Sequence, residues 1–199
     1  MTARLRHLAI LAGGASRRMG TDKRQVRLGG ETLLERAVRR GSAAGFEVVV
    51  VGGPRDVPSG ARHVPDRHPG DGPMGGIVTA LAELPTPVAA VAVDMPNYSP
   101  PLLRELAAVA PAVAAVPVAA GVPQPLHAVW GEDAVDALRV AWSDGQRSLR
   151  DFLAGAAVDM LAEDRCHRVA GEERWWLSLD TPTDLVDFSR PTGRPAPSP

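Results

Sequence analysis

The chain has 199 residues, 45% of them hydrophobic, with 22 Lys and Arg, 23 Asp and Glu, and a formal net charge of −1. This length supports one sizeable hydrophobic core, and the near-neutral charge argues against a sequence-independent nucleic-acid binder. Cys166 is the single cysteine, which excludes an intrachain disulfide framework and fits a reducing compartment. Neither a signal peptide nor an apolar run of about 20 residues is evident, so we expect a cytoplasmic protein without membrane contact.

Short apolar runs alternate with helix-like segments along the chain. Strands are predicted at residues 5–12, 46–51, 87–93, 112–118 and 126–130, with late strands near 158–161 and 175–179. Helices are predicted at 25–40, with the clearest spacing from 31 onward, and at 76–84, 101–108, 132–142 and 148–153. Ser148 caps the last of these, and a final helix follows Thr181 with Pro182 in its first turn.

Uninterrupted Val, Ala and Ile runs are typical of strands that are buried on both faces of a parallel sheet. Their alternation with helices therefore predicts a layered α/β fold. We expect one domain over residues 1–188 and a disordered tail, rich in Pro, Gly and Ser, over 189–199.

The loop after the first predicted strand combines two glycines with three basic residues. Gly13 and Gly14 let the backbone approach a ligand closely, and Arg17, Arg18 and Lys23 supply the charge that a polyphosphate needs. The loop matches neither the Walker A pattern nor G-x-G-x-x-G, which disfavours a nicotinamide-dependent dehydrogenase. The purely structural alternative is a tight turn whose basic side chains are solvated. The number of different polar residues in this short loop favours phosphate binding over that alternative.

Two aspartates follow predicted strands and are candidate Mg²⁺ ligands. Asp94 closes the 87–93 strand, where a carboxylate can hold a cation against phosphate oxygens. A helix-capping role explains Asp94 equally well. Asp180 follows the 175–179 segment, and because Thr181 and Pro182 already account for the next helix start, Asp180 needs no capping role. Ligands of open α/β sheets bind beyond the carboxyl ends of the strands, so we expect the first loop and Asp94 to face one pocket.

Two further segments have both a functional and a purely structural interpretation. The small residues at 71–76 allow a base or sugar to lie against the backbone near a helix N-terminus, although an ordinary Pro-Gly loop explains them on their own. His63, Asp66, His68 and Asp71 have the residue types of a zinc site, but they lie in a loop-like segment without a frame on which to converge.

In this order, the segments resemble the molybdenum cofactor guanylyltransferases of the nucleotidyltransferase superfamily. Residues 11–23 match L-A-G-G-x-S-x-R-M-G-x-D-K, and further elements of that family resemble residues 72–76, 93–96, 124–128, 145–150 and 179–185. The resemblance implies a three-layer α/β/α sandwich with a mostly parallel, Rossmann-like sheet. It also implies transfer of GMP from GTP to the terminal phosphate of molybdopterin, with Mg²⁺ as cofactor.

The resemblance assigns roles to individual residues. Arg18 and Lys23 would bind the triphosphate, with Arg17 as a weaker candidate, and Asp94 would be the principal metal ligand, with Asp180 as a second. The remaining assignments are backbone contacts to the nucleotide (Leu11, Ala12, Gly13, Gly14), positions near the base or ribose (Asp66, Gly75) and the acceptor side (Gln124, Ser148).

The chain departs from the family pattern at Met74 and Gly75, at Ala92, at Ser178 and Asp180, and at 52–54, where no side-chain amide is present to bind a base. Nucleobase and acceptor therefore stay open. The alternatives are a related nucleotidyltransferase that uses CTP or GTP on another pterin, sugar phosphate or phosphorylated acceptor, and a non-catalytic nucleotide-binding adaptor. The product would pass to a molybdoenzyme or its chaperone, and the sequence predicts no oligomeric state.

Overall fold

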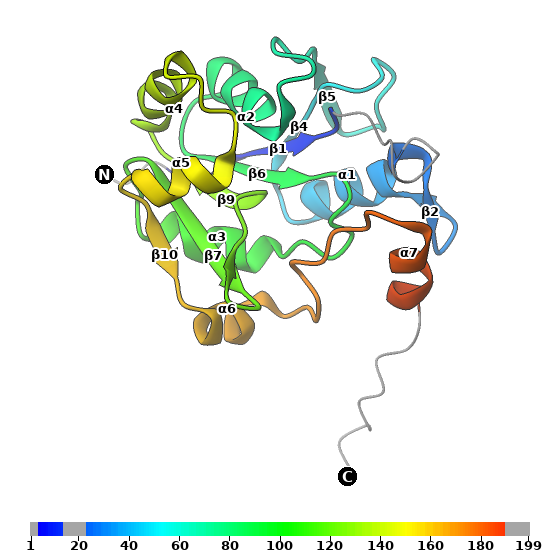
Figure 1. Ribbon diagram of the computed structural model, residues 1–199. Helices are drawn as coiled ribbons and strands as arrows, with labels where there is room; N and C mark the ends of the chain where they lie inside the picture. The colour runs from blue at the N-terminus through cyan, green and yellow to red at the C-terminus, as the bar shows by residue number, and fades with distance from the viewer. Residues whose placement is uncertain (1–3, 14–22, 190–199) are drawn as a thin grey trace.

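The structure is a computed structural model that describes residues 4–13 and 23–189, except for the side chain of Lys23. Its centre is an eight-stranded sheet in the order β10-β7-β9-β6-β1-β4-β5, with β8 paired to β7 (Figure 1). The strands are β1 (His7–Leu11), β4 (Glu47–Val51), β5 (Ala61–Val64), β6 (Val88–Ala92), β7 (Ala114–Ala119), β8 (Val122–Pro123), β9 (His127–Trp130) and β10 (Asp159–Leu161). The four strands β6, β1, β4 and β5 are parallel, and β9 runs antiparallel to both of its neighbours.

Helices cover both faces of this sheet, as Figure 1 shows. One layer holds α1 (Leu33–Ala43), α3 (Pro100–Ala108) and α6 (Glu163–Ala170), and the other holds α2 (Gly72–Glu83), α4 (Ala134–Ser143) and α5 (Leu149–Gly155). Successive side chains of β1 point to opposite faces of the sheet: Leu8 and Ile10 pack against the first helix layer, and Ala9 and Leu11 pack against the second. The strand is therefore apolar on both faces. The predicted three-layer α/β/α sandwich with a mostly parallel sheet is confirmed.

The predicted helix over 25–40 is wrong in its first part. Residues Lys23–Gln25 form the 3-10 turn η1, and β2 (Arg27–Leu28) pairs with β3 (Glu31–Thr32) in a hairpin. Gly29 and Gly30 have positive φ values that a helix does not allow. Helix α1 begins only at Leu33, where the Thr32 hydroxyl accepts a hydrogen bond from the backbone N–H of Glu35 in a capping box.

The strand predicted at 175–179 is also wrong, since this segment is made of turns and extended loop. Its apolar residues are buried without strand pairing: Trp175 and Leu179 are fully covered. Strand β5 and helix α6 were not predicted. Helix α6 is short and mostly polar, and it buries only Cys166 and Ala170, so its sequence lacks the apolar run from which the other helices were predicted.

Both predicted helix caps near the C-terminus are confirmed. The Ser148 hydroxyl accepts a hydrogen bond from the Asp151 N–H at the start of α5, and the Thr181 hydroxyl accepts one from Asp184 at the start of α7 (Pro182–Ser189). Helix α7 packs near the β2–β3 hairpin through an apolar cluster that includes Leu28, Leu33 and Leu179. Ser189 thus belongs to a helix rather than to the predicted tail, and residues 190–199 lie outside the described residues.

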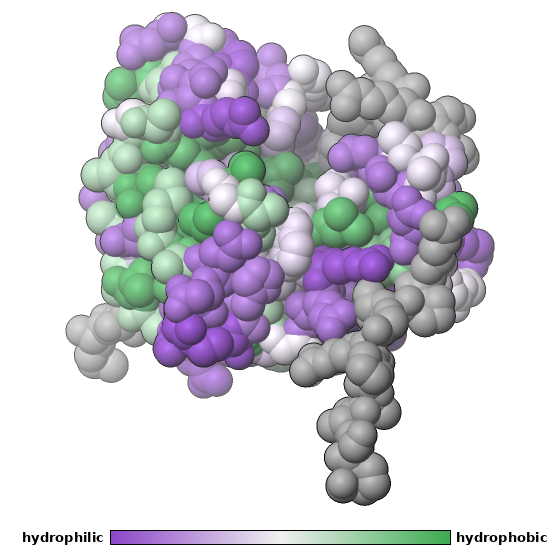
Figure 2. All heavy atoms as spheres, turned by 60° about the horizontal axis from the view of Figure 1, so that its bottom comes forward, coloured by the Kyte–Doolittle hydropathy of each residue, from purple (hydrophilic) through white to green (hydrophobic). Residues whose placement is uncertain are grey.

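The surface in Figure 2 mixes hydrophilic and hydrophobic residues. Among the described residues, the large exposed hydrophobic side chains are spread over different parts of the chain: Val109, Val122, Val140, Met160 and Val186. No described helix has the length and apolar character that crossing a membrane requires.

Candidate active site

The first loop and the Asp94 segment leave the sheet side by side. At the carboxyl end of β1, Leu11 pairs in register with Val51 of β4 on one side and with Ala92 of β6 on the other. The pairing continues past the strands, since the Ala12 N–H donates to Val51 at 2.9 Å and the Val93 N–H donates to Leu11 at 3.2 Å. Sheet register therefore brings Asp94 close to the start of the first loop, at the edge where open α/β sheets bind ligands.

Close backbone packing surrounds Gly13. A Cβ atom on Gly52, whose φ is +73°, would lie 3.1 Å from the Gly13 Cα, and a Cβ on Gly13 would lie 3.2 Å from the Asp66 Oδ2. Both contacts are tighter than ordinary van der Waals distance, so side chains at these two positions would displace their neighbours. The Gly13 backbone and the Asp66 carboxylate consequently share one small space beyond β1.

The Asp66 carboxylate is oriented by helix α2. Its Oδ1 accepts hydrogen bonds from the His68 N–H at 2.9 Å and from the hydroxyl of the fully buried Thr79 at 3.1 Å. The Thr79 hydroxyl in turn accepts from the Arg67 N–H at 3.1 Å. Because Oδ1 is held in this way, Oδ2 lies toward Gly13, where it can accept a hydrogen bond from a ribose hydroxyl or a base N–H.

The first turn of α2 lies against the same loop. A Cβ on Gly75 would lie 2.9 Å from both the Cβ and the carbonyl oxygen of His68, and one on Gly76 would lie 3.3 Å from the Leu11 Cδ2. Gly75 therefore allows the helix N-terminus to approach the Asp66–His68 turn and the end of β1 closely.

Asp180 lies one residue beyond a backbone contact to Asp94. The Leu179 N–H donates to the Asp94 carbonyl at 2.9 Å, so the two aspartates lie on adjoining segments although they are 86 positions apart in the chain. Asp94 is half-buried and Asp180 is exposed. The N–H groups of Asp180 and Thr181 donate to the Asp184 carboxylate at 2.9 and 2.7 Å, so Asp184 and Thr181 form the cap of α7.

Several predicted site residues fall in the part of the chain that the structure does not describe. Gly14, Arg17 and Arg18 fall outside the described residues, as does the side chain of Lys23. Sequence reasoning missed Arg24, whose Nη1 donates to the Ala12 carbonyl at 3.2 Å and lies beside Gly53. Its position directly after the basic loop could have indicated Arg24 as a candidate site residue.

The two residues assigned to the acceptor side make local contacts. The Gln124 Nε2 donates to the Val122 carbonyl at 3.1 Å near β8, and Ser148 is the cap of α5. These contacts explain both residues structurally.

Comparison with known proteins shows that the chain is similar to one family over most of its length. The model of the MobA-like NTP transferase domain matches residues 8–164. A probable molybdenum cofactor guanylyltransferase of Chloroflexus aggregans is 39% identical over 196 residues, covering 92% of this chain and 88% of that protein. A molybdenum cofactor guanylyltransferase of Rhizobium johnstonii is 37% identical over 198 residues, covering 92% of each.

A solved structure agrees with these sequence relatives. The crystal structure of molybdopterin-guanine dinucleotide biosynthesis protein A from Archaeoglobus fulgidus superimposes with a TM-score of 0.78 and 27% identity, covering 92% of this chain and 96% of that one.

Proposed function

Since this chain belongs to the MobA-like NTP transferase family, we propose that it transfers GMP from GTP to the terminal phosphate of molybdopterin in the molybdenum cofactor. The products are pyrophosphate and a pterin guanine dinucleotide, which serves a molybdoenzyme directly or through a chaperone. We place the reaction in the cytoplasm. The structural observation that supports it most is the junction of the first loop with the Asp94 segment at one edge of the sheet.

The reaction needs charge stabilisation more than a general base. An anionic oxygen of the pterin phosphate attacks the α-phosphorus of GTP and forms a new P–O bond. The bond to the bridging oxygen of the β-phosphate breaks, and its electron pair leaves with pyrophosphate. Because the nucleophile is already an anion, catalysis consists of bringing anions together and neutralising the charge of the transition state. We assign Arg18 and Lys23 to that task, with Arg17 beside them.

The nucleotide would lie beyond the carboxyl end of β1. Leu11, Ala12, Gly13 and Gly14 would contact it through backbone groups. The orientation of Asp66 supports a contact from its Oδ2 to the ribose or base, and Gly75 would let the N-terminus of α2 approach the same part of the nucleotide.

The donor chemistry of the Asp94 and Asp180 segments fits Mg²⁺. Carboxylate oxygens are hard ligands that this cation prefers, and Mg²⁺ typically takes one or two carboxylates together with substrate phosphates. The adjoining backbones support Asp94 as principal ligand and Asp180 as second. When bound, the cation would supply charge stabilisation at the phosphates. The half-buried position of Asp94 limits competition from water.

The test is a product assay on the purified chain. The protein is incubated with molybdopterin, Mg²⁺ and each of GTP, CTP, ATP and UTP, and the products are identified by mass. We expect a guanine dinucleotide and pyrophosphate with GTP. Asp94→Ala should abolish turnover while the circular dichroism spectrum of the fold persists. A cytosine product or turnover with another phosphorylated acceptor would move the chain to a different branch, and nucleotide binding without pyrophosphate release would indicate an adaptor.

A further inference from the structure

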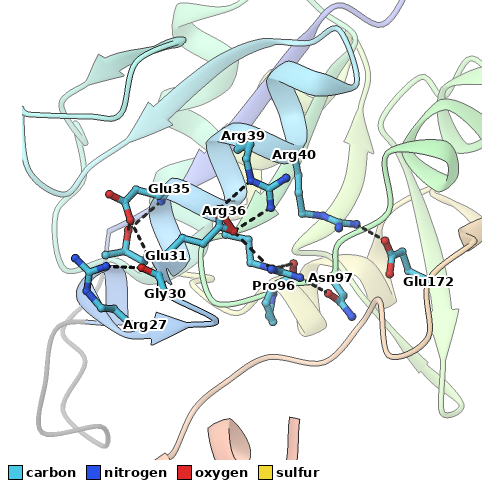
Figure 3. Close-up of polar contacts among 11 residues, drawn as sticks. Arg27, Gly30, Glu31, Glu35, Arg36, Arg39, Arg40, Pro96, Asn97 and Glu172 are labelled. Atoms are coloured by element: carbon cyan, nitrogen blue, oxygen red, sulfur yellow. Dashed lines mark hydrogen bonds and ion pairs between the residues drawn. The ribbon is translucent and has the colours of Figure 1, made fainter. Parts of the chain in front are cut away.

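Helix α1 reaches across to the segment that follows Asp94. Figure 3 shows the Arg36 guanidinium pointing at this segment. Its Nε donates to the Pro96 carbonyl at 2.9 Å and its Nη2 donates to the Asn97 Oδ1 at 3.1 Å. The Arg36 side chain is 23% exposed. Two donors of one planar group therefore hold two consecutive residues of the turn just after Asp94, in a partly dehydrated setting where such bonds are strong.

The same turn is connected to the segment that leads to Asp180. The Asn97 Nδ2 donates to the Glu173 carbonyl at 3.3 Å, and the Asp94 carbonyl accepts from the Leu179 N–H at 2.9 Å. Residues 173–179, which we call the strap, are thus bonded near both ends to the Asp94–Asn97 turn. Asp180 is the first residue beyond the strap.

A second arginine of α1 repeats this connection. The Arg40 Nη2 lies 3.0 Å from the Glu172 Oε1 and donates to the Tyr98 carbonyl at 2.9 Å, and the Tyr98 hydroxyl donates to the Ala37 carbonyl at 2.7 Å. Both the turn after Asp94 and the start of the strap are therefore fastened to α1. The helix is itself firmly seated, because its capping box is complete and its inner face is buried in the core.

We infer that Arg36 is a positioning residue that sets the relation between the Asp94 and Asp180 carboxylates through the turn and the strap. The inference rests on the proposed function, in which these two groups hold Mg²⁺ with the nucleotide. Hydrogen-bonding partners behind metal ligands orient those ligands, and losing such a partner costs about 10- to 100-fold in metal affinity. Without Arg36, the Pro96 carbonyl and the Asn97 amide oxygen lose these donors, and only the contacts at Tyr98 still connect this segment to the helix.

The chain offers a matched control on the same helix. Arg39 is also an α1 arginine, but its Nε and Nη2 donate to Glu31 at 2.8 and 2.9 Å (Figure 3), and its side chain is 57% exposed. Within the part of the chain that the structure describes, Arg39 makes no hydrogen bond to the Asp94–Asn97 turn or to the strap. Arg39→Ala therefore removes the same charge and chain length from α1 while both hydrogen bonds from Arg36 to the turn stay in place. The Glu31 carboxylate that it releases still lies 3.6 Å from the Arg36 Nη1.

The experiment measures the Mg²⁺ requirement for nucleotide binding, so it does not depend on turnover. The full chain is titrated calorimetrically with α,β-methylene GTP, which cannot release pyrophosphate, at a series of free Mg²⁺ concentrations. The readout is the Mg²⁺ concentration that half-maximally tightens binding. We expect Arg36→Ala to raise this midpoint about 10- to 100-fold. Arg39→Ala should stay within about twofold of the unmodified chain, since exposed ion pairs contribute little.

Two further variants guard against a folding defect. Arg36→Lys keeps the charge but cannot reproduce two donors in a fixed plane, so its midpoint should fall between those of the unmodified chain and Arg36→Ala. Asn97→Ala keeps Arg36 but cuts the bond to the strap, and it should also raise the midpoint. Equal midpoints in Arg36→Ala and Arg39→Ala, with only the melting temperature changed, would overturn the inference and leave the proposed function intact. If the unmodified chain binds the analogue without any Mg²⁺ dependence, the metal assignment and the inference fail together.

Discussion

Acid should weaken the fold through one buried histidine, His127 in β9. Its side chain is fully buried, and its Nε2 accepts a hydrogen bond from the Ser99 N–H at 2.9 Å. Burial lowers the pKa of His127 from 6.5 to about 3. If Nε2 were protonated, its N–H would face the Ser99 N–H, and the hydrogen bond between them would be lost. Ser99 is the N-cap of α3 and lies five residues after Asp94.

The sign and size follow from linkage between proton binding and folding. The folded-state pKa is depressed for a base, so between pH 6.5 and about 3 the unfolded chain binds one proton more than the folded chain. The stabilisation is therefore present above pH 6.5 and is lost as the pH falls through this window. The slope is about 1.4 kcal/mol per pH unit, which amounts to roughly 2.5 kcal/mol between pH 7 and pH 4.5.

A variant separates this effect from that of the carboxylates. His127→Gln places an amide oxygen where Nε2 accepts the Ser99 N–H, and it does not titrate. The assay is urea denaturation of both proteins at pH 7 and at pH 4.5, analysed for the free energy of unfolding. The histidine protein should lose about 2.5 kcal/mol more than the glutamine variant. Equal losses would refute the view that His127 is held neutral by burial.

Three further substitutions test the site. Lys23→Ala should lower kcat/KM for GTP about 100-fold, as expected for loss of one preorganised charge donor, and an unchanged value in steady-state kinetics would remove Lys23 from the site. Gly13→Ala should raise the KM for GTP about tenfold by pushing on the Asp66 Oδ2, while Gly155→Ala, where an added Cβ meets nothing within 4 Å, serves as the control with unchanged KM. Thr79→Val removes the hydroxyl that holds Asp66, and we expect a higher KM for GTP together with a loss of about 1 kcal/mol in unfolding free energy by urea denaturation.

Sequence periodicity predicted the central strands of the sheet well because they are buried on both faces, whereas the partly exposed strand β5 was missed. The run at 87–93 is apolar throughout, and β6 occupies Val88–Ala92 with every residue buried. The helix start at Leu33 was missed, although Thr32 and Glu35 have the spacing of a capping box that would have indicated it. The strap misled the prediction because its apolar residues are buried by packing from loops, and an apolar run alone does not distinguish this from strand pairing.

The candidate site also has one part that the sequence predicts and one part that it does not. The place of Asp94 follows from a strand end, so sequence alone could predict it. The orientation of Asp66 depends on Thr79, 13 residues away, and the turn after Asp94 depends on Arg36, about 60 residues away. Such pairings arise from tertiary packing, which leaves no periodic signal in the chain.

The two acidic residues therefore take their positions from different sources. Asp94 follows from the register of β6 against β1, which is among the most deeply buried parts of the molecule. Asp180 depends on the strap, which is held by a few hydrogen bonds and by the packing of residues such as Trp175 and Leu179. Because rigid strands and bonded loops respond differently to mutation, a change in α1 can displace one carboxylate relative to the other without disturbing the sheet. For this reason we expect Arg36, which lies on a helix outside the proposed nucleotide site, to tune the proposed Mg²⁺ binding by Asp94 and Asp180.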